Sequence, residues 1–117
     1  MRRLMLLRHA KSNWPAGVAD RDRPLAARGR EAAPAMGRYL AEELLLPDLV
    51  LISPAKRTVE TWELVASMLP EKPATQYEPR IYEAKPGALL YVVQETEPSV
   101  KTLLMVGHNP GFEELAQ

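Results

Sequence analysis

Residues 103–110, LLMVGHNP, place four consecutive apolar side chains just before a histidine. The arrangement has two counterparts, since residues 4–9 read LMLLRH and residues 49–57 read LVLISPAKR. Apolar runs this short, without alternating polar residues, are typical of strands buried on both faces, as in a parallel sheet. The three stretches therefore predict three inner strands of a parallel sheet, each followed by polar side chains.

Amphipathic stretches separate these strands. Apolar residues at helical spacing predict helices over residues 32–44 and 59–69. Leu89, Leu90 and Val93 predict a third, shorter helix after Pro86-Gly87. Pro34 is expected in the first turn of the first helix, so that this helix begins late. Strands that alternate with helices predict an α/β fold with right-handed crossovers. We expect a three-layer α/β/α sandwich with a mostly parallel sheet and helices on both faces.

Two further segments complete the expected elements. Residues 75–82 predict a strand at the edge of the sheet, because Pro79 interrupts it. Asn109 is expected to cap a last helix whose first residue is Pro110.

Composition limits the classes of function. The chain has 117 residues, 15 basic and 15 acidic side chains, two histidines and no cysteine. The length suits one domain, and 46% hydrophobic residues suffice for a core. Zero net charge disfavours a nucleic-acid partner. The lack of cysteine excludes thiol chemistry. No apolar run approaches the roughly 20 residues of a membrane span. We expect one soluble, cytoplasmic domain with neither nucleic acid nor membrane as partner, and its oligomeric state stays open.

Both histidines of the chain directly follow predicted strands. In parallel α/β sheets, ligands bind at the carboxyl ends of the strands, so His9 and His108 are expected to meet in one site. A single histidine in such a place more often hydrogen-bonds a loop carbonyl, but a pair is better explained by a functional site. Arg8 ends the first strand and requires an anionic partner there.

Arg57 adds a second cation. Ser53 is a natural N-cap and Pro54 a natural first residue of the following helix, which places Arg57 in the first turn, where a helix attracts anions. Two arginines and two imidazoles suit a phosphoryl dianion, and a neutral imidazole is a competent nucleophile toward phosphorus. The sequence contains no Gly-x-x-x-x-Gly-Lys loop, no close Asp cluster for magnesium and a poor set of ligands for zinc. We therefore expect chemistry without a metal or cofactor.

Three segments resemble the signatures of a known family. Residues 7–12, LRHAKS, resemble the Arg-His-Gly signature of the histidine phosphatase superfamily, which has the phosphoglycerate mutase-like fold. Residues 53–61, SPAKRTVET, resemble its second signature, and residues 106–110, VGHNP, its third. The Arg-His-Ala-Lys form of the first motif, with RPL at 23–25 and RG at 28–29, is most similar to the small SixA-type phosphohistidine phosphatases.

The resemblance implies roles for the site residues. His9 would be the nucleophile that is transiently phosphorylated, and Arg8, Arg57 and His108 would complete the phosphate pocket. Ser12 and Asn13, in the loop after the nucleophile, either add hydrogen bonds to the substrate or only shape the turn. Family members continue past the third motif with another strand and helix, so residues 1–117 are expected to be a single domain lacking that segment.

The general acid is less well defined. Larger relatives use a carboxylate before the third motif, which makes Glu83 the first candidate and Asp22 the second, although each could be an ordinary exposed carboxylate. Because imidazole leaves more easily than an alkoxide, the lack of an obvious acid favours a phosphohistidine substrate.

The resulting hypothesis is a metal-independent phosphatase that removes phosphate from histidine on a partner protein. The alternatives are a phosphatase for small phosphomonoesters and a non-catalytic phosphate-binding or interaction module. Trp14 either forms part of a rim around the site that touches a substrate protein or is packed at the edge of the fold. Arginines 21, 23, 28 and 30, interleaved with acidic residues, are expected to form a solvated face.

Overall fold

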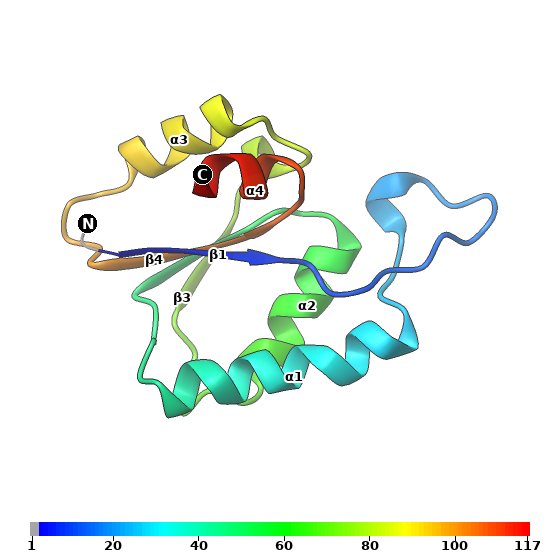
Figure 1. Ribbon diagram of the computed structural model, residues 1–117, viewed down its shortest axis with the longest axis horizontal. Helices are drawn as coiled ribbons and strands as arrows, with labels where there is room; N and C mark the ends of the chain where they lie inside the picture. Colours follow the sequence, from blue (N-terminus) through cyan, green and yellow to red (C-terminus); the bar gives the residue numbers. More distant parts are fainter. Residues whose placement is uncertain (1–2) are drawn as a thin grey trace.

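The computed structural model describes residues 3–117 and contains a sheet with the strand order β1-β4-β2-β3 (Figure 1). The strands are β1 (Arg3–Arg8), β2 (Leu49–Ile52), β3 (Ala74–Tyr77) and β4 (Thr102–Gly107). Every pairing between them is parallel. The predicted α/β fold is confirmed.

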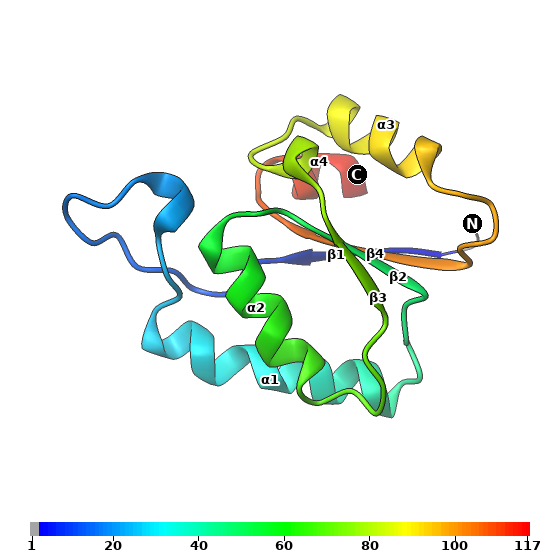
Figure 2. The ribbon, with the colours of Figure 1, turned by 180° about the vertical axis from the view of Figure 1, so that it is seen from behind.

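Helices cover both faces of this sheet. Helices α1 (Ala27–Glu42) and α2 (Lys56–Ala66) lie on one face, and α3 (Pro86–Glu95) and α4 (Gly111–Ala116) lie on the other (Figures 1 and 2). The molecule is therefore a three-layer α/β/α sandwich, as the alternation of strands and helices predicts.

The position of β4 between two other strands, with both faces covered, explains why its sequence is continuously apolar. Leu104 and Val106 pack with α1 and α2 in one cluster that includes Trp62. Leu103 and Met105 point to the opposite face and pack with α3 and α4. Successive side chains of a strand point to opposite faces, so a strand covered on both faces needs an apolar residue at each position.

Strand β1 differs from the prediction of a fully buried inner strand. It lies at one end of the strand order, pairs only with β4 among the described residues, and keeps residues 4–7 only half-buried. A four-residue apolar run cannot distinguish an inner strand from an edge strand whose two faces are each partly covered.

Helix α1 begins earlier than predicted. It starts at Ala27, so Pro34 lies in its interior rather than in its first turn. An interior proline costs about 3 kcal/mol because it removes a backbone hydrogen bond and crowds the preceding turn. Close packing on both sides of Pro34 offsets this cost. A Cβ atom on Gly29 would lie 2.2 Å from the Lys11 carbonyl oxygen, and one on Gly37 would lie 2.2 Å from that of Val65.

The remaining elements are short. Strand β3 is exposed at the edge of the sheet, as predicted, but it ends before Pro79, which begins the 3-10 turn η2 (Pro79–Ile81). Helix α4 begins at Gly111 rather than Pro110, and the Asn109 side chain accepts a hydrogen bond from the backbone N–H of Glu113. No helix within residues 3–117 has the length and apolar character needed to cross a membrane.

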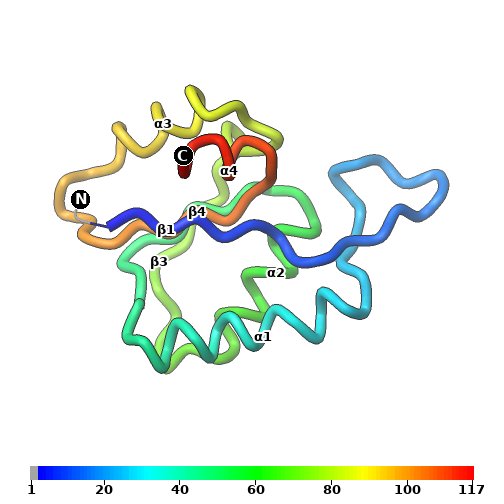
Figure 3. The backbone as a smooth tube through the Cα atoms, in the orientation of Figure 1, coloured from blue at the N-terminus to red at the C-terminus, as the bar shows by residue number. Residues whose placement is uncertain are grey.

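A long connection between β1 and α1 positions the site. Figure 3 shows it leaving the carboxyl end of β1, projecting beyond the sheet and returning to α1. Its two arms are joined where Ser12 pairs with Leu25 and where the backbone N–H of Asn13 donates to the Pro24 carbonyl (2.9 Å). A short 3-10 turn, η1 (Asp20–Asp22), lies on the returning arm.

Candidate active site

A pocket of about 430 Å³ lies at the carboxyl ends of β1 and β4 and the amino end of α2. The polar residues predicted from the strand ends line it together with residues of the projecting connection. Its lining comprises Arg8, His9, Ala10, Lys11, Ser12, Trp14, Asp20, Arg23, Arg57, Glu83, His108 and Asn109. The structure thus brings together the four residues predicted to form the phosphate pocket.

His9 is held with one ring nitrogen occupied. Its Nδ1 lies 2.8 Å from the Ala10 carbonyl oxygen, so Nδ1 carries the proton and donates, while Nε2 keeps a free lone pair. The backbone N–H of Ala10 donates to Thr61 Oγ1 of α2 (3.0 Å), which fixes the turn behind the ring. Burial lowers the pKa of His9, and the positive charges of Arg57 and Arg8 add to this effect. His9 is therefore neutral, the form that attacks phosphorus.

His108 lies beside His9, with the two ring centroids 5.5 Å apart. Its Nδ1 lies 3.3 Å from Arg57 Nη2, and its Nε2 lies 2.7 Å from Ser53 Oγ. Because a guanidinium only donates, Nδ1 is the acceptor and Nε2–H donates to the serine. Burial, reinforced by the Arg57 charge, lowers the pKa of His108 to about 4.

Ser53 does not cap α2. The helix begins at Lys56 after Ala55, which provides no side-chain cap, and Ser53 instead orients His108. The predicted N-cap was therefore wrong, because residues 53–55 continue from β2 as an extended turn before the helix begins. Arg57 nevertheless lies in the first turn, as expected, and its side chain is only 2% exposed.

Arg57 is surrounded by acceptors. Its Nη1 donates to the main-chain oxygen of Asp20 (2.7 Å). Its Nη2 contacts Asp20 Oδ2 (3.1 Å) and Glu83 Oε1 (2.8 Å). Its Nε is buried and has no hydrogen-bond partner within residues 3–117. A buried guanidinium that neutralises carboxylates at the wall of a pocket can equally neutralise a phosphoryl group.

Asp20 is the site residue that sequence reasoning missed. It accepts hydrogen bonds from Tyr82 Oη, from Arg23 Nη1 (2.9 Å) and from Arg57. These contacts, that of Tyr82 first, hold the pKa of Asp20 far below its usual range, so this carboxylate is ionised. The candidate acid Asp22 is exposed and lies outside the pocket lining, because the η1 turn directs Asp20 inward instead. The three-residue spacing from Asp20 to Arg23 is the only sequence signal that could have indicated it.

Arg23 contradicts the prediction of a solvated arginine face. It is 6% exposed, its Nε donates to the Asn13 carbonyl (2.9 Å) and its Nη2 donates to Ser12 Oγ (2.7 Å). Its guanidinium also lies 3.2 Å from the centroid of the Trp14 ring. Ser12 therefore lines the pocket while bonded to Arg23, and Asn13 contributes its main chain, with its side chain outside the lining.

Glu83, the first candidate for the general acid, lies in the pocket. Its backbone has a left-handed φ of 50°, and its carboxylate pairs with Arg57 while remaining 46% exposed. It is thus the candidate acid that the fold places beside Arg57, at the mouth of the pocket.

Comparisons with known proteins agree with this geometry. The family model of the histidine phosphatase superfamily (branch 1) matches residues 4–103. An uncharacterized protein of Mycobacterium tuberculosis is 42% identical over 110 residues, which cover 94% of this chain and 67% of that protein. The chain therefore spans about two thirds of the length of this relative.

Solved structures show the same architecture. A SixA-type structure from Agrobacterium tumefaciens is 31% identical, with a TM-score of 0.91 over 98% of this chain and 74% of that one. The protein histidine phosphatase SixA in complex with tungstate is 24% identical and matches in fold, with a TM-score of 0.85 over 97% of this chain and 73% of that one. The pocket, the signatures and these similarities agree, and the chain belongs to the histidine phosphatase superfamily.

Proposed function

We propose that the chain is a metal-independent phosphatase that removes phosphate from histidine side chains of a partner protein, through a phosphorylated His9. The observation that carries the proposal is the state of His9. Its Nδ1–H is tied to a backbone carbonyl, its Nε2 is free, and its ring lines the same pocket as Arg8, Arg57 and His108. Family membership supports phosphatase activity, and similarity to SixA-type structures supports phosphohistidine as the substrate.

The first step transfers the phosphoryl group to the enzyme. His9 Nε2 attacks phosphorus in line, a nitrogen–phosphorus bond forms, and the bond to the substrate imidazole breaks. Arg8 and Arg57 offset the charge on the phosphoryl oxygens. The dianion also favours protonation of His108, whose Nδ1–H then donates to a phosphoryl oxygen. In the second step water attacks the phosphorylated His9 and releases inorganic phosphate.

Glu83 is suited to assist the leaving group. In the free site it pairs with Arg57. A phosphoryl group that binds Arg57 releases Glu83 from this pair, which leaves its carboxyl group at the mouth of the pocket, beside the leaving group. The position of Glu83 in the pocket is also the observation that favours the second candidate function, hydrolysis of small phosphomonoesters, since an alkoxide needs a proton donor.

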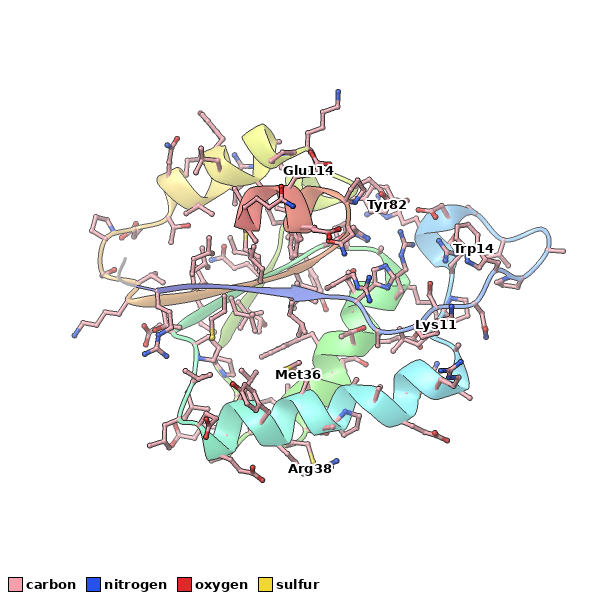
Figure 4. All side chains as sticks on the ribbon, in the orientation of Figure 1. Lys11, Trp14, Met36, Arg38, Tyr82 and Glu114 are labelled. Carbon is pink, nitrogen blue, oxygen red and sulfur yellow. The ribbon has the colours of Figure 1, made fainter. Side chains whose placement is uncertain are left out.

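The test compares two substrates on chelator-treated protein. A histidine-phosphorylated protein and a simple phosphomonoester are offered to the parent, to His9→Ala and to the control Arg38→Ala, whose exposed side chain lies on α1, far from the pocket (Figure 4). We expect release of phosphate from phosphohistidine with chelator present, full activity in the control, and a loss of at least about a thousandfold without the nucleophile.

Radiolabelled substrate adds a second measurement. An acid-labile, alkali-stable label should appear on the parent protein and be absent from His9→Ala. Turnover of the ester alone would favour the second candidate function, and activity restored only by added metal would contradict the metal-independent mechanism.

A further inference from the structure

The pocket is larger than a phosphoryl group requires. Besides the residues assigned to the phosphate, the wall includes Lys11 and Trp14, from the connection between β1 and α1. A volume of about 430 Å³ is in the range of pockets that enclose a whole small ligand. There is therefore room along this wall for the group that carries the phosphate.

Trp14 is the prominent feature of that wall. Its side chain is 78% exposed, which is unusual for an indole and leaves much of its apolar surface in contact with water. Figure 4 shows it between the two arms of the projecting connection, with Lys11 at the base of that connection. An exposed tryptophan on the wall of a pocket needs an explanation other than core packing.

One face of the indole is covered by a fixed side chain. The guanidinium of Arg23 stacks on the ring at 3.2 Å. Arg23 in turn uses Nε, Nη1 and Nη2 to bond Asn13, Asp20 and Ser12. This network is buried on the Arg23 side, so the ring rests on a support that cannot easily move. A rigid aromatic surface loses little entropy when a ligand stacks on it.

We propose that Trp14, supported by Arg23, determines specificity by stacking with a planar ring attached directly to the phosphoryl group. This inference rests on the proposed function, in which that ring is the imidazole of phosphohistidine. Imidazole has little apolar surface to bury, so the flat π-face of the ring is the feature that a stacking side chain can recognise. An aliphatic phosphomonoester offers no such face, so the contact distinguishes the two candidate substrate classes.

Two non-hydrolysable probes test the contact independently of turnover. Phenylphosphonate carries a ring on phosphorus and methylphosphonate does not, so the ratio of their dissociation constants measures the contribution of the ring. We expect Trp14→Leu to weaken phenylphosphonate binding about tenfold in calorimetry and methylphosphonate binding less than twofold. Trp14→Phe should retain most of the preference for the ring. Tyr91→Ala, an exposed aromatic change on α3 outside the pocket, should leave both constants unchanged.

The outcomes separate this proposal from the proposed function. Equal weakening of both probes in Trp14→Leu would mean that Trp14 only supports the loop, and the stacking proposal would be overturned even if the parent hydrolyses phosphohistidine. An unchanged ratio of the two constants would overturn it as well. A selective loss for phenylphosphonate would support the stacking surface, and the separate hydrolysis assay then decides whether the natural ring is imidazole.

Discussion

At the scale of single residues, the carboxylate of Asp20 occupies a donor that the proposed mechanism assigns to the phosphoryl group, Arg57 Nη2. Asp20 bonds both Arg57 and Arg23 and is ionised. Its main-chain oxygen also holds Arg57 Nη1, so one residue of the connection both orients and partly neutralises the buried guanidinium. Under the proposed mechanism, a bound phosphoryl group displaces or shares these contacts, so Asp20 is expected to oppose anion binding while it keeps the arginines in position.

Removing this charge should strengthen phosphate binding. Asp20→Asn keeps the size of the side chain but removes a negative charge next to Arg57, which in a partly exposed site is worth about 1 kcal/mol. We expect inorganic phosphate to bind about fivefold more tightly in calorimetry. Asp22→Asn is the matched control, because it removes the same charge from the same turn outside the pocket. Weaker binding in Asp20→Asn would show that positioning of the arginines outweighs repulsion.

At the scale of elements, the separation of α1 and α2 depends on Gly37. A Cβ atom there would lie 2.2 Å from the Val65 carbonyl oxygen and 2.9 Å from the Cβ of Met68, so the two helices approach as closely as their backbones allow. Because α2 carries Arg57 in its first turn, this packing also contributes to the position of the site.

Gly37→Ala should therefore destabilise the fold. Overpacking against backbone forces one helix to shift, and we expect the free energy of unfolding to fall by about 2 kcal/mol or more in urea denaturation. Gly87→Ala is the control. It is also a helical glycine, but its added Cβ meets nothing within 4 Å, so it should lie within about 1 kcal/mol of the parent. Equal effects of the two substitutions would contradict the close approach of α1 and α2.

The sequence predicts the elements better than the contacts between them. Apolar runs that end in Arg8-His9 and Gly107-His108 locate the strands and the histidines, because burial and strand ends leave a local pattern. The inward position of Asp20 and the burial of Arg23 leave only the three-residue spacing between these two residues, since both depend on how the connection folds back between Ser12 and Leu25. Pro34 misleads for a related reason, because the packing that offsets its cost comes from segments distant in the sequence.

At the scale of the whole molecule, the site is held together by elements from most of the chain. His9 follows β1, Arg57 begins α2, Glu83 follows η2 and His108 follows β4, with Asp20 contributed by η1. The hydrogen bonds among them join segments 26 to 62 residues apart, such as Arg57 with Glu83 and Tyr82 with Asp20. The ionisation of the site is therefore linked to the stability of the fold.

This linkage gives stability a defined dependence on pH. The pKa of His108 is about 4 in the folded chain, against an ordinary value of 6.5. Between these pH values the unfolded chain binds a proton that folded His108 does not, so the stability contributed by neutral His108 is complete above pH 6.5 and decreases as the pH falls toward 4. The lowered pKa of His9 acts in the same direction. Ionised Asp20 also stabilises the fold, but over a different pH range. Its contribution is present above pH 3.8, the ordinary pKa of the group, and is lost only as the pH falls below that value.

The slope of stability against pH tests the role of His108. We expect the free energy of unfolding, from urea denaturation, to fall by up to about 3 kcal/mol between pH 6.5 and pH 4. In His108→Gln the amide can still accept from Arg57 and donate to Ser53, yet it cannot titrate. This variant should lose most of the slope whatever its absolute stability, and the remainder includes the lowered pKa values of His9 and, near pH 4, of Glu78. An equally steep slope in His108→Gln would show that other groups cause the acid sensitivity, because only the titrating imidazole has been removed.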